Sequence, residues 1–137
     1  HALASYVPRN NRSELEQTAH NSLIIDAYNA NPTSMAAALA NFRDMKADRK
    51  MAILGDMNEL GAVSGEEHQR VADFLQSAGF DQVWLVGPEF GKTECTFRKF
   101  KDVDEVKKEL EANRPEGFCI LIKGSNSIRL YQLKEWL

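Results

Sequence analysis

The sequence has little of what marks membrane, disulfide-rich or nucleic-acid-binding proteins. Its two cysteines among 137 residues, Cys95 and Cys119, lack C-x-x-C spacing, so we expect reduced thiols in a cytoplasmic protein. No apolar run approaches the ~18 residues that span a membrane, and the start lacks a signal-peptide pattern. We therefore expect no membrane insertion. The net charge of -3 argues against non-specific binding to nucleic acid.

The common nucleotide and metal motifs are also missing. No Gly-x-Gly-x-x-Gly follows the first apolar run, which argues against a stand-alone nucleotide-binding module. Gly87–Thr93 resembles a phosphate-binding P-loop, but three residues stand where the motif has four, and Glu89 would repel phosphate. No second histidine or cysteine stands at metal-ligand spacing, so the sequence predicts no metal site of its own.

Four short apolar runs are present, and they do not alternate apolar with polar residues. Such runs are typical of strands covered on both faces, and helical patterns lie between them. The sequence therefore predicts one α/β domain, a Rossmann-like, mostly parallel sheet flanked by helices. The runs are Leu23–Ile25, Met51–Leu54, Val83–Val86 and Phe118–Ile122.

Local signals set the expected limits of the helices. Asn31 before Pro32 predicts an N-cap, Ser64–Glu67 reads as a capping box, and Asp102 is a further cap. We expect a weak fifth strand at 96–100 and a short helix at 128–137. Residues 1–12 are interpreted as a connector and 13–137 as the domain.

Polar residues follow the apolar runs where parallel strands share one edge. Asp26 and Asp56 follow the first two runs, and Lys123 closes the last. Ligands of parallel α/β sheets bind at this edge, and helix N-termini there favour anions. The sequence thus predicts a phosphate-binding mouth, although turn formers and caps explain single positions equally well. Asn31 is explained as a cap, and His68 as a structural or exposed residue.

Three segments carry a resemblance to a known family. Asp26–Met35 (DAYNANPTSM), Leu54–Gly61 (LGDMNELG) and Lys123–Ser127 (KGSNS) resemble, in order and spacing, the C-terminal domain of the Mur ligases. Within that family they are most similar to the branch that adds D-alanyl-D-alanine to UDP-N-acetylmuramoyl-tripeptide, using ATP and Mg²⁺. The resemblance implies an amide-forming ligase whose P-loop and most magnesium ligands lie in other domains. The isolated chain is then expected to be a monomer without activity of its own.

The resemblance also implies roles for individual residues. Arg12 and Asp26 are expected to act in catalysis and, together with Tyr28, Asn29 and Asn31, to contact the nucleotide. Lys123, Gly124, Ser125 and Asn126 are expected to bind the incoming dipeptide, whose carboxylate suits a cation and backbone N–H groups. Glu59 and His68 fit the family pattern without an assigned step.

One alternative from another class stays open at this point. A receiver-like signalling domain has a similar size and uses strand-end acids with a strand-end lysine, so Asp56 would be its phosphoacceptor. The chain departs from that pattern, because Ala27 rather than an acid follows Asp26, and Gly124 rather than proline follows Lys123.

Overall fold

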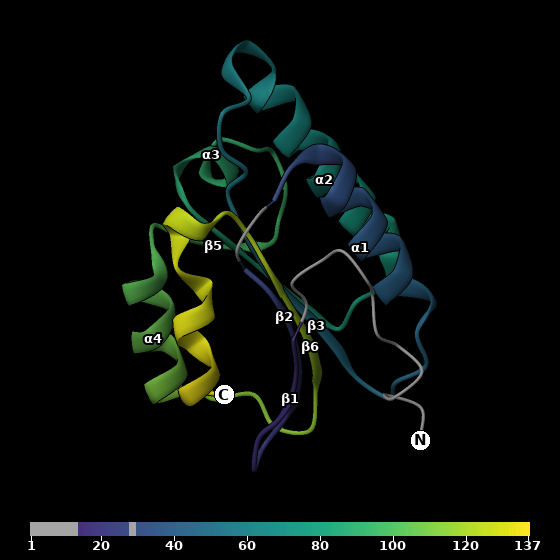
Figure 1. The fold of residues 1–137 in the computed structure, drawn as a ribbon, viewed down its shortest axis with the longest axis vertical. Coiled ribbons are helices and arrows are strands. Elements are labelled where there is room, and N and C mark those ends of the chain that lie inside the picture. Colours follow the sequence, from purple (N-terminus) through teal and green to yellow (C-terminus); the bar gives the residue numbers. More distant parts are fainter. Residues whose placement is uncertain (1–13, 28–29) are drawn as a thin grey trace.

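The computed structural model describes residues 14–27 and 30–137, which form a three-layer α/β domain. Figure 1 shows α1 and α2 on one face of the sheet, with α4 and the C-terminal η4 on the other. The elements, in chain order, are β1 (Glu14–Gln17), β2 (Ser22–Asp26), α1 (Pro32–Asp44), β3 (Lys50–Gly55), η2 (Gly61–Val63), α2 (Ser64–Ala78), β4 (Gln82–Val86), α3 (Pro88–Gly91), β5 (Arg98–Phe100), α4 (Val103–Ala112), β6 (Cys119–Lys123), η3 (Asn126–Ile128) and η4 (Leu130–Glu135).

The sheet has six strands in the order β1-β2-β6-β3-β4-β5. All neighbouring pairs are parallel except β1 with β2, so the predicted mostly parallel sheet is confirmed. The four central strands coincide with the four apolar runs, and the weak fifth strand is present at β5. Strand β1 was not predicted, because a short polar edge strand carries no apolar pattern.

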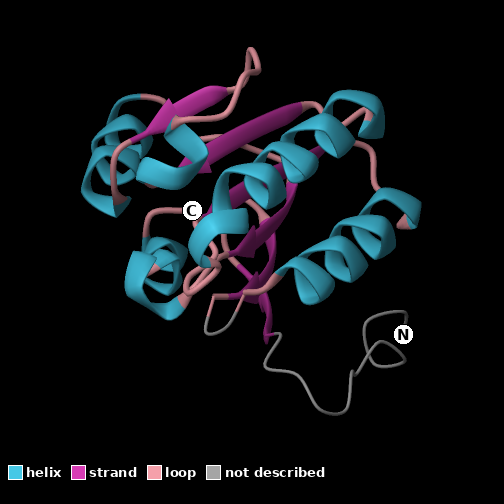
Figure 2. Ribbon diagram, turned by 90° about the horizontal axis from the view of Figure 1, so that it is seen from above, coloured by secondary structure: helices cyan, strands magenta, loops and turns pink. Residues whose placement is uncertain are grey.

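Two apolar cores lie on the two faces of the sheet. The view from above in Figure 2 shows the helices that cover these two faces. Side chains alternate between faces along a strand, so Leu23 and Ile25 enter one core and Ile24 the other. Burial on both faces explains why these strands read as continuous apolar runs. In the described part of the chain, no helix has the length and apolar character needed to cross a bilayer.

Most helix limits follow the signals in the sequence. Asn31 Oδ1 accepts from Ser34 N at 2.8 Å, and Asp102 caps α4 through Glu105 N at 3.1 Å. The capping box predicted at Ser64 was wrong. The 3-10 turn η2 runs directly into α2, so Ser64 already has helical backbone angles and its hydroxyl bonds Glu89 instead. The predicted C-terminal helix consists of two 3-10 segments, η3 and η4.

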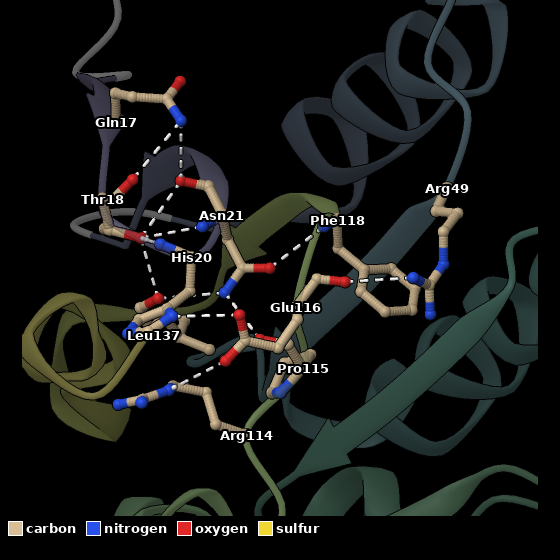
Figure 3. Close-up of polar contacts among 10 residues, drawn as sticks. All are labelled: Gln17, Thr18, His20, Asn21, Arg49, Arg114, Pro115, Glu116, Phe118 and Leu137. Carbon is tan, nitrogen blue, oxygen red and sulfur yellow. Dashed lines mark hydrogen bonds and ion pairs between the residues drawn. The ribbon is translucent and has the colours of Figure 1, made fainter.

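The amino-terminal edge of the sheet is held by a buried asparagine, shown in Figure 3. The Nδ2 group of Asn21 donates to the carbonyl oxygens of Pro115 and Leu137, both at 2.9 Å. Its Oδ1 accepts from Phe118 N at 3.0 Å, and Asn21 as a whole residue is only 2% exposed. Thr18 Oγ1 also donates to the Leu137 carbonyl at 2.8 Å. This network joins the β1–β2 turn, the segment before β6 and the C-terminal residues, far from the edge with the candidate site.

Candidate functional site

The carboxyl ends of β2, β6 and β3 lie side by side and bring the predicted residues to one edge. Asp26 pairs in register with Lys123, and Lys123 pairs with Leu54, two residues before Asp56. Ser125 N also donates to the Asp56 carbonyl oxygen at 3.0 Å, so the segments after β3 and β6 are in contact. Asp26, Asp56 and Lys123 therefore lie at one edge of the sheet, as the strand ends predict, although the Asp56 carboxylate turns toward α3.

Asp26 and Lys123 form a buried ion pair. Lys123 Nζ lies 2.7 Å from Asp26 Oδ2, and the side chains are 1% and 13% exposed respectively. A carboxylate that closes a buried strand requires a partner, which the sequence did not name. The partner is one strand away and 97 positions later in the chain. The lysine therefore holds Asp26 in place at the mouth instead of projecting an exposed ammonium group.

Asp56 has a structural task. Its Oδ2 accepts from Glu89 N and its Oδ1 from Phe90 N, both at 2.9 Å, so the carboxylate binds the first turn of α3. Burial raises the pKa of Asp56, while these two N–H groups act against that rise. Gly87 makes room for it, since a Cβ there would lie 2.4 Å from the carboxyl carbon. With Asp56 3% exposed and both oxygens engaged, the expectation of a phosphoaccepting Asp56 in a receiver-like domain fails.

A pocket of about 570 Å³ opens where these segments meet. It gathers the segments that follow β2, β3 and β6, and most of its polar groups are amides and hydroxyls. Its lining consists of Ala30, Asn31, Asn58, Glu59, Leu60, Ser125, Asn126 and Ser127. Neutral donors with one exposed carboxylate suit a ligand that carries a carboxylate and an ammonium group.

The backbone is constrained at two positions near the pocket, Gly124 and Glu59. A Cβ on Gly124 would lie 2.9 Å from the Gly55 Cα and 3.0 Å from its nitrogen, so only glycine fits where the backbones approach. At the pocket, Glu59 adopts a φ of 63°, a left-handed conformation that non-glycine residues rarely take. Such backbone strain clusters at ligand sites.

The sequence-predicted site residues differ in where they fall. Asn31, Ser125 and Asn126 line the pocket. Gly124 is buried, and Asp26 and Lys123 lie at the ends of the neighbouring strands β2 and β6. The Asn31 side chain also serves as the α1 cap, which matches the simpler interpretation of that residue. The predictions for Arg12, Tyr28 and Asn29 lie outside the described residues.

Asn58 and Ser127 are pocket residues to which no role was assigned from sequence. Asn58 Nδ2 donates to Ser127 Oγ at 2.7 Å, and Ser127 Oγ lies 3.1 Å from Ser125 Oγ. Asn58 lies within the motif at 54–61 and Ser127 within the motif at 123–127, and this is the sequence signal by which both residues could have been found. Within 14–27 and 30–137, no group of three or more His, Cys, Asp or Glu side chains is placed to hold a metal ion.

Comparison with known proteins matches residues 11–126 to the family described as Mur ligase, glutamate ligase domain. A UDP-N-acetylmuramoyl-tripeptide–D-alanyl-D-alanine ligase of Escherichia coli is 42% identical over 123 residues, covering 85% of this chain and 27% of the relative. The ligase of the same name from Treponema pallidum is 34% identical over 123 residues, covering 83% and 27%.

Solved structures agree with these relatives. MurF from Acinetobacter baumannii superposes with a TM-score of 0.78 at 26% identity, covering 94% of this chain and 30% of that chain. MurF ligase from Thermotoga maritima, crystallised in complex with ADP, has a TM-score of 0.77 at 24% identity, covering 98% and 32%, and supports the fold. The chain spans about a third or less of the length of each of these proteins. By its sequence match and its fold, the chain belongs to the Mur ligase family.

Proposed function

We propose that this chain is the C-terminal domain of an ATP-dependent ligase that joins D-alanyl-D-alanine to UDP-N-acetylmuramoyl-tripeptide. The reaction would take place in the cytoplasm, in the peptidoglycan synthesis that supports cell shape and cell division. The names of the relatives support the reaction, and the 27% coverage of those relatives supports a division of labour among domains. ATP and the UDP-linked peptide would be held largely by the other domains of a full-length monomer.

The observation that carries this proposal is the convergence of three family motifs on one pocket. Ala30 and Asn31 come from the first motif, Asn58 to Leu60 from the second, and Ser125 to Ser127 from the third. Chain segments nearly 100 residues apart supply the donors for one ligand. A dipeptide zwitterion fits this set, because hydroxyl and amide donors can bind its carboxylate while the Glu59 carboxylate faces its ammonium group.

The nucleotide side of the site follows from the resemblance, with one revision. The resemblance assigns Asp26 and Asn31 to the nucleotide, together with Arg12, Tyr28 and Asn29. Because Asn31 also lines the pocket, it would lie where the nucleotide and the dipeptide meet. Lys123 holds the Asp26 carboxylate, so its part is to fix that acid rather than to meet the dipeptide directly. Magnesium is assigned to the other domains, since Asp26 and Asp56 are engaged inside this one.

The chemistry proposed is amide formation through an acyl phosphate. The γ-phosphoryl group of ATP is transferred to the peptide carboxylate, and ADP leaves. The ammonium group of the bound dipeptide first loses a proton to solvent, and the resulting neutral amine attacks the acyl carbon. The tetrahedral intermediate then collapses: inorganic phosphate departs with the bonding electrons, and the nitrogen releases a second proton to solvent to leave the neutral amide. This domain contributes by holding the amine at the acyl carbon, which is the positioning part of catalysis.

The test compares two asparagines in the full-length ligase. Asn126→Ala removes an exposed pocket amide, whereas Asn113→Ala removes the exposed C-cap amide of α4 at the opposite edge. Loss of a hydrogen bond to a carboxylate should raise the KM for D-alanyl-D-alanine about tenfold or more, with the KM for ATP retained. Equal kinetics of the two variants would contradict the proposal, as would ligation catalysed by this domain alone.

A further inference from the structure

The segment Asp56–Asn58, at the end of β3, is held at each of its three residues by a different part of the domain. Asp56 binds the first turn of α3 through its carboxylate. Met57 N donates to Nε2 of His68, on α2, at 3.0 Å. Asn58 Nδ2 donates to Ser127 in the pocket. The middle contact depends on one fully buried histidine, with 0% exposure.

The contacts of His68 distinguish its two ring nitrogens. Nε2 accepts from Met57 N, so the ring hydrogen is on Nδ1, which donates to the Ser64 carbonyl oxygen at 2.7 Å. The Ser64 hydroxyl lies 3.2 Å from the same nitrogen, and the ring packs edge-on against Phe90 with centroids 4.7 Å apart. Both ring nitrogens are therefore engaged with α2 and Met57, away from the pocket ligand. This histidine is placed to hold a backbone and not to exchange protons with a substrate.

Both neighbours of Met57 contact the pocket segment that follows β6. The Asp56 carbonyl oxygen accepts from Ser125 N at 3.0 Å, and the Asn58 amide donates to Ser127 Oγ at 2.7 Å. The two serine hydroxyls lie 3.1 Å apart. A shift of Met57 would displace one flanking contact or both, because adjacent residues move together along the chain.

We propose that His68 is a positioning residue for the dipeptide site, acting through Met57 on the segment Ser125–Ser127. The proposal rests on the function proposed above for that segment. This role requires a hydrogen-bond acceptor at the place of Nε2, and the remainder of the imidazole serves packing and the bond to Ser64.

The test exploits two amides of different length in the full-length ligase. In His68→Gln the side-chain oxygen reaches the place of Nε2 and can accept from Met57 N. In His68→Asn the amide reaches only the place of Nδ1, and Met57 N loses its acceptor. Both replacements are polar amides. Asn ranks with His in helix propensity and Gln ranks higher, so the local exchange at Met57, rather than overall stability, reports the acceptor.

The readouts are amide exchange and a split of kinetic constants. His68→Asn should speed hydrogen exchange of Met57 and Ser125 N–H and raise the KM for D-alanyl-D-alanine about tenfold, while the KM for ATP stays within about twofold. His68→Gln should restore both. Asn21→Ala, which destabilises the opposite edge, should leave both KM values unchanged. Should His68→Asn fail to fold, Asn58→Ala is the second variant. Asn58 is exposed, and its replacement removes the hydrogen bond to Ser127, so the KM for D-alanyl-D-alanine should rise.

Each result has a distinct meaning. Unchanged exchange at Met57 and Ser125 in His68→Asn would overturn the positioning role. Equal kinetic losses in His68→Asn, His68→Gln and Asn21→Ala would overturn it as well, because general instability would then explain them. Faster exchange with an unchanged KM for the dipeptide would show that His68 holds Met57, and would instead reject Ser125–Ser127 as the dipeptide site.

Discussion

Replacing Gly87 by alanine should destabilise this domain by about 3 kcal/mol or more, through two effects that the structure separates. The first is backbone strain. Gly87 has φ 118° and ψ 161°, a region essentially confined to glycine, and the strain of a side chain there costs about 1–3 kcal/mol.

The second effect comes from the Asp56 carboxylate. An alanine Cβ would lie 2.4–2.6 Å from its three carboxyl atoms, so the carboxylate must leave the N–H groups of Glu89 and Phe90. Each buried N–H left without a partner costs about 1–3 kcal/mol. For a chain of 137 residues, each kcal/mol corresponds to about 3–4 °C in Tm, so we expect a fall of roughly 10 °C or more.

Urea unfolding followed by circular dichroism measures this change, and Gly79→Ala is the matched control. Gly79 also has a positive φ, 78°, but nothing lies within 4 Å of its Cβ position, so only strain of about 1–2 kcal/mol is expected. In an Asp56→Ala background, Gly87→Ala should cost less than in the parent, because its collision partner is gone. Equal losses at Gly87 and Gly79, or additivity within about 0.5 kcal/mol in the cycle, would refute the reasoning.

Three further predictions concern buried polar groups, each measured by urea unfolding. Lys123→Met and Asp26→Asn should each cost about 3–5 kcal/mol by stranding a buried partner, and the double variant should cost less than their sum; additive losses would contradict the pair. Asn21→Ala should cost about 2–4 kcal/mol, because three hydrogen bonds disappear at 2% exposure; a loss below 1 kcal/mol would argue against the network. Burial raises the pKa of Asp56, so its contribution to stability is fully present below its unfolded pKa and is lost as pH rises through the folded value. The advantage of the parent over Asp56→Asn should therefore shrink from acid toward neutral pH, and a growing advantage would refute the sign.

The sheet was predictable because burial on both faces leaves a strong local signal. The runs at β2, β3, β4 and β6 are apolar throughout, whichever face each side chain enters. Helix α3 left no such signal. It has four residues, and its first turn is satisfied by Asp56, more than 30 positions earlier in the chain.

The candidate site was predictable in its location and less so in its contacts. Strand-end rules placed Asp26 and Lys123 at one edge, and the register confirms it. Their mutual pairing follows from the strand order, in which β6 lies between β2 and β3, and no local pattern encodes that order. For the same reason His68 had no assignable task, since its partner Met57 belongs to another segment of the chain.

The contact between Gly55 and Gly124 separates what can vary in this pocket from what cannot. Main chain touches main chain there, so no exchange of side chains can compensate for a change at Gly124. Two and three residues later, Asn126 and Ser127 are exposed and free of core packing. Substitutions at Asn126 and Ser127 can therefore change which ligand the pocket prefers, while the contact at Gly124 keeps the start of the segment in place. Engineering of the pocket for other ligands would begin at those two positions.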